Sequence, residues 1–285
     1  MPWRPPTNDR FYRLIVRTGQ FLRWALRLDI HATGLEHLPE KGPTRGPSRL
    51  VAPGKGAVFA VTHFGYLDFA VLELLLWRHA RAQLRFLVHQ GAADHWLAGP
   101  AISASGHVVV GYTDRSDAYD AAVAKLRDGE YLAVFPEAGV SRSFTVRECR
   151  TGAVRMAAEA GVPVIPVSVW GAHRVLTRGH GFSLRRSWRA PVRVHVAEPV
   201  VYPPDVDVEA ATEALRRTLQ SGIDQCIAGF PLRPESGAWW MPAHLGGGAP
   251  TDAERQLLDA ADAAAGRRRA PRRRQAPQRT ARSPK

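Results

Sequence analysis

The chain is poor in cysteine, with two among its 285 residues, Cys149 and Cys226. Two cysteines are too few for a disulfide framework, so the composition favours a reducing, cytoplasmic setting. The N-terminus has no apolar segment ahead of a small-residue cleavage site, so we expect no secretory signal. There is also no uninterrupted run of about 18 apolar residues, and we expect no helix that spans a membrane.

Acidic residues are absent from residues 266–285, which hold eight arginines and one lysine and supply nine of the 13 net positive charges. This tail is rich in Ala, Pro, Gln and Arg, which cannot build a core, so we predict disorder. A solubility extension, attraction to anionic lipid headgroups and nucleic-acid binding all remain open. Nucleic acid is the least favoured, because no aromatic residues interleave with the arginines.

A chain of this length accommodates one α/β domain with extensions. Residues 1–28 are expected to carry a basic amphipathic helix, because apolar and arginine side chains of residues 10–28 fall on opposite faces. Such a helix suits a membrane interface, or it docks on the domain with its arginines in water. The main domain is expected over residues 29–232. An irregular extension over 233–265 and the disordered tail over 266–285 follow it.

Apolar runs and helical patterns alternate along the main domain. Strands are predicted at Ala57–Thr62, Leu84–Val88, Val108–Val110, Tyr131–Phe135, Val162–Trp170 and Val192–Ala197. Helices are predicted at Asp68–Trp77, Ser116–Arg127, Gly152–Ala160 and Val208–Ala228. This alternation predicts an α/β fold, a single domain with a mixed, mostly parallel sheet flanked by helices. Pro166 within a strand pattern favours an edge or a bulge there.

His63 directly follows the strand predicted at Ala57–Thr62, at the sheet edge where ligands collect in α/β folds. Asp68 lies five residues later, in the first turn of the next helix. A tight turn through Gly65 would let the carboxylate accept a hydrogen bond from imidazole Nδ1. Nε2 would then be free to act as a base toward a hydroxyl group. The alternative is a helix-capping aspartate beside an unrelated histidine.

The His-x4-Asp spacing is weak by itself. With 11 histidines and 14 aspartates in 285 residues, chance gives roughly half a match. A second copy runs from His89 to Asp94 without a further polar motif at a comparable position, and we interpret it as the start of a surface helix. The first copy is favoured because Phe135-Pro136-Glu137 follows Asp68 at the exit of another predicted strand.

The loop after that second strand brings polar groups together around a flexible glycine. Its residues are Glu137, Ala138, Gly139, Val140, Ser141, Arg142 and Ser143. A guanidinium and backbone amides can bind phosphate oxygens, while a carboxylate accepts from a hydroxyl or holds the arginine. Arg115 is another candidate, because an arginine at a helix N-terminus adds charge to an anion site. An ion pair with Asp114 or Asp117 is its alternative role.

Four ordered blocks across roughly residues 30–200 resemble the 1-acylglycerol-3-phosphate acyltransferase family of glycerolipid acyltransferases. The blocks are Val61–Asp68, Gly111–Arg115, Phe135–Gly139 and Val162–Val167. The resemblance implies a membrane-associated enzyme at the cytoplasmic, inner face of the cell membrane. It would move an acyl group from a thioester donor, acyl-CoA or acyl carrier protein, to the sn-2 hydroxyl of 1-acylglycerol-3-phosphate.

The resemblance also implies roles for individual residues. His63 would be the general base and Asp68 its orienting carboxylate, while the fourth block, near Pro166, would line the site. The acceptor's phosphate region would be bound by Arg115, Glu137, Ala138, Gly139, Ser141 and Arg142. The implied reaction needs no metal, no cofactor beyond the thioester co-substrate and no covalent acyl-enzyme. Neither Cys149 nor Cys226 has a histidine nearby in sequence to activate it.

This chain departs from the family pattern in the glutamate loop, which usually runs Glu-Gly-Thr-Arg-Ser. Ala138 replaces the glycine, and Val140 stands where the arginine is expected, with Arg142 two positions later. We expect Arg142 to do the arginine's work. After Phe86, where many members have a lysine, this chain has His89-Gln90.

Other functions stay open on the sequence alone. Glycerol 3-phosphate or a glycolipid could be the acceptor, and water in place of an alcohol would give thioester hydrolysis. A non-catalytic membrane-binding protein is the alternative from another class, and the intact His63, Asp68 and Glu137 argue against it. The expected partners are a lysophospholipid, an acyl thioester, an anionic membrane surface and, for one donor, acyl carrier protein.

Overall fold

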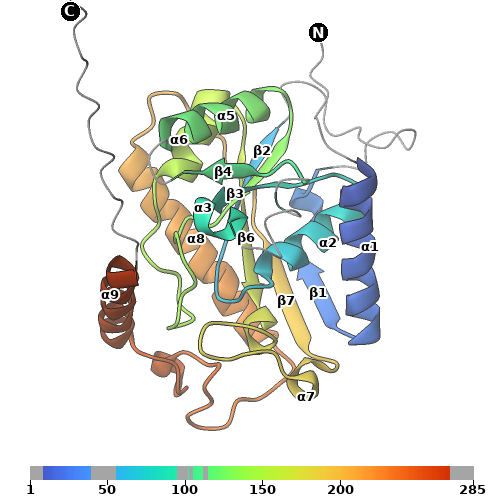
Figure 1. Cartoon of the computed structure of the whole chain (residues 1–285), viewed down its shortest axis with the longest axis vertical. Helices are drawn as coiled ribbons and strands as arrows, with labels where there is room; N and C mark the ends of the chain where they lie inside the picture. Colours follow the sequence, from blue (N-terminus) through green and yellow to red (C-terminus); the bar gives the residue numbers. More distant parts are fainter. Residues whose placement is uncertain (1–8, 40–55, 95–101, 103–104, 112–114, 270–285) are drawn as a thin grey trace, which may run out of the picture.

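The structure, a computed structural model, describes residues 9–39, 56–94, 102, 105–111 and 115–269 (Figure 1). Seven strands in these residues form one sheet in the order β1-β7-β6-β2-β5-β3-β4. The strands are β1 Asp29–Thr33, β2 Ala57–Val61, β3 Arg85–His89, β4 Val108–Val110, β5 Tyr131–Val134, β6 Val164–Trp170 and β7 Pro191–Val196. All neighbours are parallel except β6 and β7, which are antiparallel. The expected mixed, mostly parallel α/β sheet is confirmed.

Helices cover both faces of the sheet (Figure 1). They are α1 Asp9–Ala25, α2 Asp68–Ala80, α3 Gln90–Ala93, α5 Arg115–Arg127, α6 Gly152–Ala160, α7 Leu184–Ser187, α8 Val208–Ala228 and α9 Asp252–Arg269. Single 3₁₀ turns lie at η1 Leu35–His37, η2 Ala172–Arg174 and η3 Ala243–Leu245. None of the helices described here is long and apolar enough to cross a membrane.

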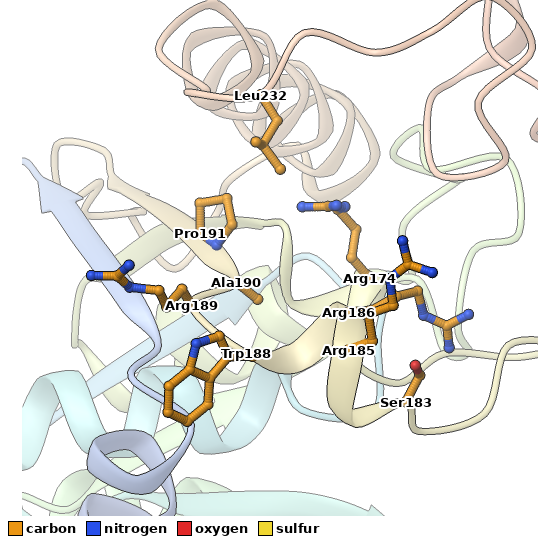
Figure 2. A pocket seen from close by; sticks show the side chains of 9 residues that line it. All are labelled: Arg174, Ser183, Arg185, Arg186, Trp188, Arg189, Ala190, Pro191 and Leu232. Atoms are coloured by element: carbon orange, nitrogen blue, oxygen red, sulfur yellow. The ribbon is translucent and has the colours of Figure 1, made fainter.

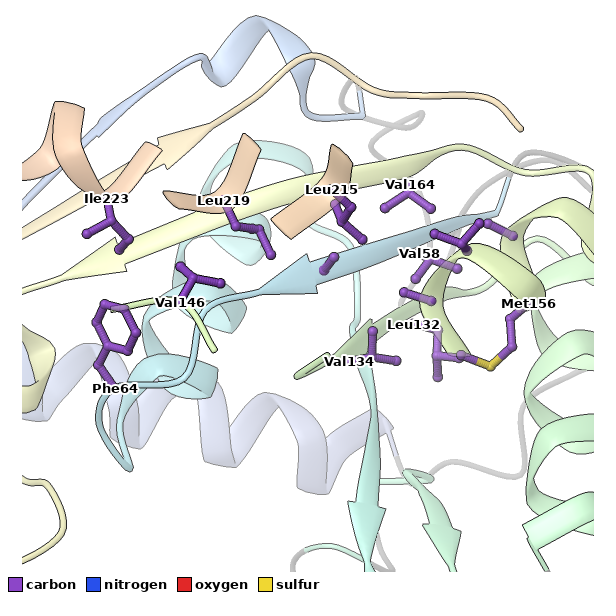
Figure 3. Close-up of a cluster of buried hydrophobic side chains, with 14 of the residues drawn as sticks. Val58, Phe64, Leu132, Val134, Val146, Met156, Val164, Leu215, Leu219 and Ile223 are labelled. Atoms are coloured by element: carbon purple, nitrogen blue, oxygen red, sulfur yellow. The ribbon is translucent and has the colours of Figure 1, made fainter. Parts of the chain in front are cut away.

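Strand β2 shows how the core is divided. All five of its residues are buried, and successive side chains point to opposite faces. Val58 and Ala60 join the cluster under α5, α6 and α8 (Figure 3), which also holds Met156 and Leu215. The intervening residues of β2 join the cluster under α2. A strand buried on both faces reads as a continuous apolar run, which is why the sequence predicts it so clearly.

The strand at Val164–Trp170 corrects the expectation that Pro166 marks an edge. Strand β6 lies inside the sheet, between β2 and β7. Its ladder with β7 begins only at Val167, and a separate bridge joins Val164 to Val200. Pro166, which lacks an amide donor, therefore sits where this ladder is interrupted.

The N-terminal helix forms as expected and takes the docked alternative, whereas the C-terminal extension differs from the expectation. Helix α1 docks on α2 through buried Tyr12, whose hydroxyl accepts from the Leu84 amide at 3.2 Å. The same helix also exposes Phe21 and Trp24. The extension predicted to be irregular over 233–265 instead leads into helix α9, which continues to Arg269. The rest of the tail, residues 270–285, lies outside the described residues.

Candidate active site

Two motifs far apart in the sequence meet at one edge of the sheet. Strands β2 and β5 are parallel neighbours, so their carboxyl ends lie side by side. His63 follows β2 and Glu137 follows β5. The two residues are joined directly, because the His63 amide donates to Glu137 Oε1 at 2.8 Å. The topology thus brings the His-x4-Asp motif and the glutamate loop together, as expected.

The His63 imidazole faces the carboxylate of Asp68. Their closest atoms, Nδ1 and Oδ2, are 3.5 Å apart, and the Asp68 side chain is only 1% exposed against 16% for His63. Asp68 Oδ2 also accepts from the amides of Phe64 at 2.8 Å and Gly65 at 2.7 Å. These amides close the turn that holds the pair together. Burial raises the pKa of Asp68, although the contact with His63 opposes that shift.

Gly65 is required by close packing at this turn. A Cβ at this position would lie 2.8 Å from the Cα of His173. The segment after β6 can therefore press against the turn, and it does so through two hydrogen bonds. The Tyr66 amide donates to the Leu176 carbonyl at 3.0 Å, and the Thr177 hydroxyl donates to the Phe64 carbonyl.

Phe135 packs against one face of the His63 imidazole, a role that sequence analysis missed. Its ring stacks on the His63 imidazole, with the centroids 3.9 Å apart and the planes 19° apart. The signal was in the sequence, because Phe135 opens the Phe-Pro-Glu motif and directly follows β5. The segment that follows β5 thus supplies both the ring stacked on His63 and the carboxylate bonded to its amide.

The Glu137 carboxylate is buried and accepts from backbone amides. It is 2% exposed, and its second oxygen, Oε2, accepts from the Arg147 amide at 3.1 Å. Burial raises its pKa to about 8, against the opposing effect of the two amides. Its carboxylate therefore fixes the backbone of His63 and of the loop's far end. Sequence analysis expected this group in the acceptor site.

The residues after Glu137 fold the loop back onto the histidine. Ala138 adopts φ +54°, the left-handed conformation in which glycine is unstrained. The Ser141 amide donates to the His63 carbonyl at 2.8 Å. The Ser141 hydroxyl is buried and donates to the Thr145 carbonyl at 2.9 Å, so it supports the loop. Gly139 is half-buried, and a Cβ there would be 3.2 Å from Arg147 Nη1.

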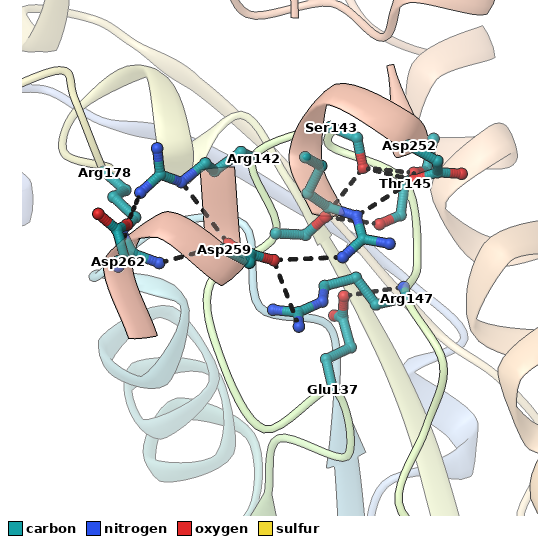
Figure 4. Close-up of polar contacts among 11 residues, drawn as sticks. Glu137, Arg142, Ser143, Thr145, Arg147, Arg178, Asp252, Asp259 and Asp262 are labelled. Carbon is teal, nitrogen blue, oxygen red and sulfur yellow. Dashed lines mark hydrogen bonds and ion pairs between the residues drawn. The ribbon is translucent and has the colours of Figure 1, made fainter. Parts of the chain in front are cut away.

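Arg142 meets an unexpected partner, helix α9 (Figure 4). Its guanidinium pairs with Asp262, and its Nε lies 3.8 Å from Asp259 Oδ1. Arg147 and Arg178 contact the same carboxylates. The loop arginine therefore belongs to a group of three arginines that face an acidic helix, which sequence analysis did not anticipate.

The remaining candidates are only partly described. Arg115 begins α5, as expected for a helix N-terminus, but its side chain lies outside the description. In the second His-x4-Asp copy, Asp94 accepts from the Gln90 side chain at 2.7 Å on the exposed surface. Burial raises the pKa of both Cys149 and Cys226 to about 12, so neither thiol ionises readily to a nucleophile.

The chain is similar to known acyltransferases. The family model described as "Acyltransferase" matches residues 29–170. A curated 1-acyl-sn-glycerol-3-phosphate acyltransferase of Chlamydomonas reinhardtii is 24% identical over 188 residues, which is 65% of this chain. The match spans about half of that relative, 53% of its length.

The fold has a counterpart among solved structures. The 1-acyl-sn-glycerophosphate acyltransferase PlsC of Thermotoga maritima is similar with a TM-score of 0.58 and 21% identity, covering 77% of this chain and 81% of PlsC. That likeness establishes the fold. Because the family model spans β1 through β6, with the His63 turn and the glutamate loop inside it, the chain belongs to the acyltransferase family.

Proposed function

We propose that the protein transfers an acyl group from a thioester donor to the sn-2 hydroxyl of 1-acylglycerol-3-phosphate, forming phosphatidate. The observation that carries this proposal is the His63–Asp68 pair, a partly exposed imidazole backed by a buried carboxylate at the carboxyl edge of the sheet. The relatives' names supply the reaction class and the acceptor. The donor is acyl-CoA or acyl carrier protein, both of which present a thioester.

In the proposed reaction His63 Nε2 takes the proton from the acceptor hydroxyl as the oxygen attacks the thioester carbonyl. Asp68 lies at Nδ1, fixes the tautomer and stabilises the imidazolium that forms. The tetrahedral intermediate then collapses, the C–S bond breaks, and the imidazolium returns the proton to the leaving thiolate. The products are an ester and a free thiol, and no residue of the chain becomes acylated.

The structure supports two kinds of role among the other site residues. Glu137 and Ser141 are positioning residues, because their polar atoms are engaged within the loop and with the backbone of His63. Ala138 and Gly139 shape the turn between them. Arg142 and Arg115 are the cations that we propose for the acceptor's phosphate, Arg142 from the loop and Arg115 from the start of α5.

We also propose that the protein works at the inner face of the cell membrane. Helix α1 exposes Phe21, Leu22 and Trp24, and Arg27, two residues after its end, lies over the ring of Trp188, 5.4 Å from the centroid. Around Trp188 is a shallow pocket, none of whose described lining residues is acidic (Figure 2). Its arginines are Arg174, Arg185, Arg186 and Arg189. Exposed aromatic rings beside arginines suit an anionic bilayer surface.

The acceptor could instead be glycerol 3-phosphate or a glycolipid, because Val140 replaces the arginine that the family has at that position. These acceptors would use the same base and the same thioester. A purely membrane-binding role is not favoured, since Asp68 and Phe135 contact the His63 imidazole and Glu137 accepts from the His63 backbone amide. Such an assembly serves chemistry and is not needed for adsorption.

A thiol-release assay with long-chain acyl-CoA and 1-acylglycerol-3-phosphate tests the proposal. We expect acceptor-dependent release by the wild type and a loss of several orders of magnitude in His63→Ala. His89→Ala removes the histidine of the second His-x4-Asp copy and is the matched control, with activity near wild type. Release that does not depend on an acceptor would show a thioesterase instead. Glycerol 3-phosphate in place of 1-acylglycerol-3-phosphate tests the acceptor. Acyl carrier protein in place of CoA as the acyl carrier tests the donor.

A further inference from the structure

Three arginines, Arg142, Arg147 and Arg178, form a cluster next to the turn that carries His63. We call them the arginine cluster. Arg142 follows Ser141, whose amide donates to the His63 carbonyl. Arg178 follows Thr177, whose hydroxyl donates to the Phe64 carbonyl. The arginine cluster is therefore fixed to the backbone of the catalytic turn from two sides, through segments that follow β5 and β6.

Two carboxylates of α9 face this cluster (Figure 4). Asp259 lies 3.5 Å from Arg147 Nη2 and 3.7 Å from Arg178 Nη1. Asp262 lies 2.8 Å from Arg178 Nη2 and also pairs with Arg142. The two aspartates are three residues apart and so project from the same side of the helix. Asp259 also pairs with Arg255 of its own helix at 3.2 Å, so the two carboxylates face the three arginines of the cluster and one arginine of α9.

The fit between the two groups is incomplete. Asp259 Oδ1 and Arg142 Nε are buried atoms without a hydrogen-bond partner among the described residues. The Asp259 contacts to Arg142, Arg147 and Arg178 are longer than direct hydrogen bonds. A phosphomonoester carries about −1.5 to −2 charges on three acceptor oxygens. It matches the charge of the carboxylate pair and offers oxygens that guanidinium groups bind in a bidentate manner.

Helix α9 is held in place by polar contacts. Among its residues with described side chains, 252–264, none belongs to either apolar cluster of the core. Leu257 is 72% exposed and Leu258 is 39% exposed. The helix caps itself, because Thr251 and Glu254 bond each other's amides and side chains. It can therefore leave the cluster without exposing a buried apolar face.

We infer that the arginine cluster is a binding site for a phosphomonoester and that α9 closes it in the free protein, with Asp259 and Asp262 as a displaceable pair of carboxylates. The inference rests on the proposed function in one respect, that the phosphomonoester is the headgroup of the acyl acceptor. Arg147 and Arg178 thereby become acceptor-binding residues beside Arg142. Acceptor binding and closure by α9 exclude each other, so a bound acceptor shifts the equilibrium toward released α9.

Hydrogen exchange of the full chain tests the inference without acyl transfer. Amide protection in peptides covering residues 252–264 is measured with and without saturating sn-glycerol 3-phosphate, and glycerol serves as the uncharged control. We expect the phosphomonoester, but not glycerol, to lower protection of α9. The same ligand is titrated calorimetrically into Asp259→Asn/Asp262→Asn, for which we expect a Kd about tenfold lower, as for a closed state populated about nine-tenths of the time.

The matched control is Asp205→Asn/Glu235→Gln, which removes two exposed carboxylates elsewhere and should leave Kd unchanged. Binding of sn-glycerol 3-phosphate with unchanged α9 protection, or equal Kd in all three proteins, would overturn the inference. So would the absence of binding to the Asp259→Asn/Asp262→Asn variant. If α9 is displaced while no acceptor is acylated, the proposed function fails and this inference stands. If acyl transfer occurs and α9 stays protected, the reverse holds.

Discussion

Arg142 and Asp262 lie 120 positions apart in the sequence and form an ion pair that closes helix α9 over the glutamate loop. Their charges have opposite consequences for a phosphate-bearing acceptor. The guanidinium attracts the phosphate, whereas the carboxylate competes with it. Substitutions of the two residues should therefore change the acceptor KM in opposite directions, although each breaks the same contact.

Replacement of Arg142 by Gln is expected to raise the acceptor KM by about 10- to 100-fold, the value of one or two hydrogen bonds to a charged group. The kcat should change little, because the side chain does not contact the His63–Asp68 pair. Arg217→Gln removes an exposed arginine of α8 and serves as the control in the same steady-state assay. A large loss of kcat with unchanged KM would contradict the role of Arg142 in binding.

Replacement of Asp68 by Asn is expected to lower kcat by about 100-fold or more, because the tautomer and the imidazolium of His63 both lose their stabilising carboxylate. Asp94→Asn, in the second His-x4-Asp copy, should leave kcat unchanged.

The wild type should also lose activity on acidification. Since burial raises the pKa of Asp68, its carboxylate takes up a proton at a higher pH than an aspartate in water. Equal kcat values for Asp68→Asn and wild type would refute the pairing.

The Ala138→Gly variant should be more stable than the wild type by roughly 0.5–1 kcal/mol, measured by urea unfolding. Ala138 is exposed at φ +54°, so glycine relieves backbone strain without leaving a cavity. Ala124→Gly, the same change on the exposed side of helix α5, should lose about 1 kcal/mol. Destabilisation of similar size at both positions would rule out strain at Ala138.

Glu137 should give the free energy of unfolding a distinct pH dependence. Its pKa is about 8 in the folded chain and near its ordinary value of 4.5 in the unfolded chain. Between these values the folded state holds a proton that the unfolded state has released, so stability falls as the pH rises, by about 1.4 kcal/mol per pH unit. Glu137→Gln lacks this titrating group. The free energy of unfolding of the wild type minus that of the variant should therefore fall from pH 5 to pH 8. A constant difference would contradict the raised pKa.

Sequence analysis predicted the features that depend on local pattern. Buried strands such as β2 are continuous apolar runs, and the position of His63 after β2 follows from the strand alone. The fold class and the meeting of the two motifs at one edge were predicted for the same reason. Strand β1 was missed although its five residues alternate polar and apolar like a half-buried strand, because so short a pattern is weak until its pairing with β7 is seen.

Other features depend on contacts between distant residues, which no local pattern records. Glu137 looks like a substrate ligand in sequence, yet two backbone amides turn its carboxylate inward. The aspartates of α9 look like the solvated face of a helix, because their arginine partners lie in other loops. Arg142 was placed in the right loop, but its neutralisation by α9 could not be predicted.

Because α9 is attached by charge, the stability of the fold and the ease with which the site opens depend on different residues. The apolar clusters that stabilise the sheet include none of residues 252–264 of this helix, so these residues can change without weakening the core. One substitution at Asp259 or Asp262 would reset how readily the site opens. Ionic strength would act in the same direction, because screening weakens exposed ion pairs far more than a buried core. The equilibrium between the open and the closed site can thus change through α9 alone, while the core of the domain stays the same.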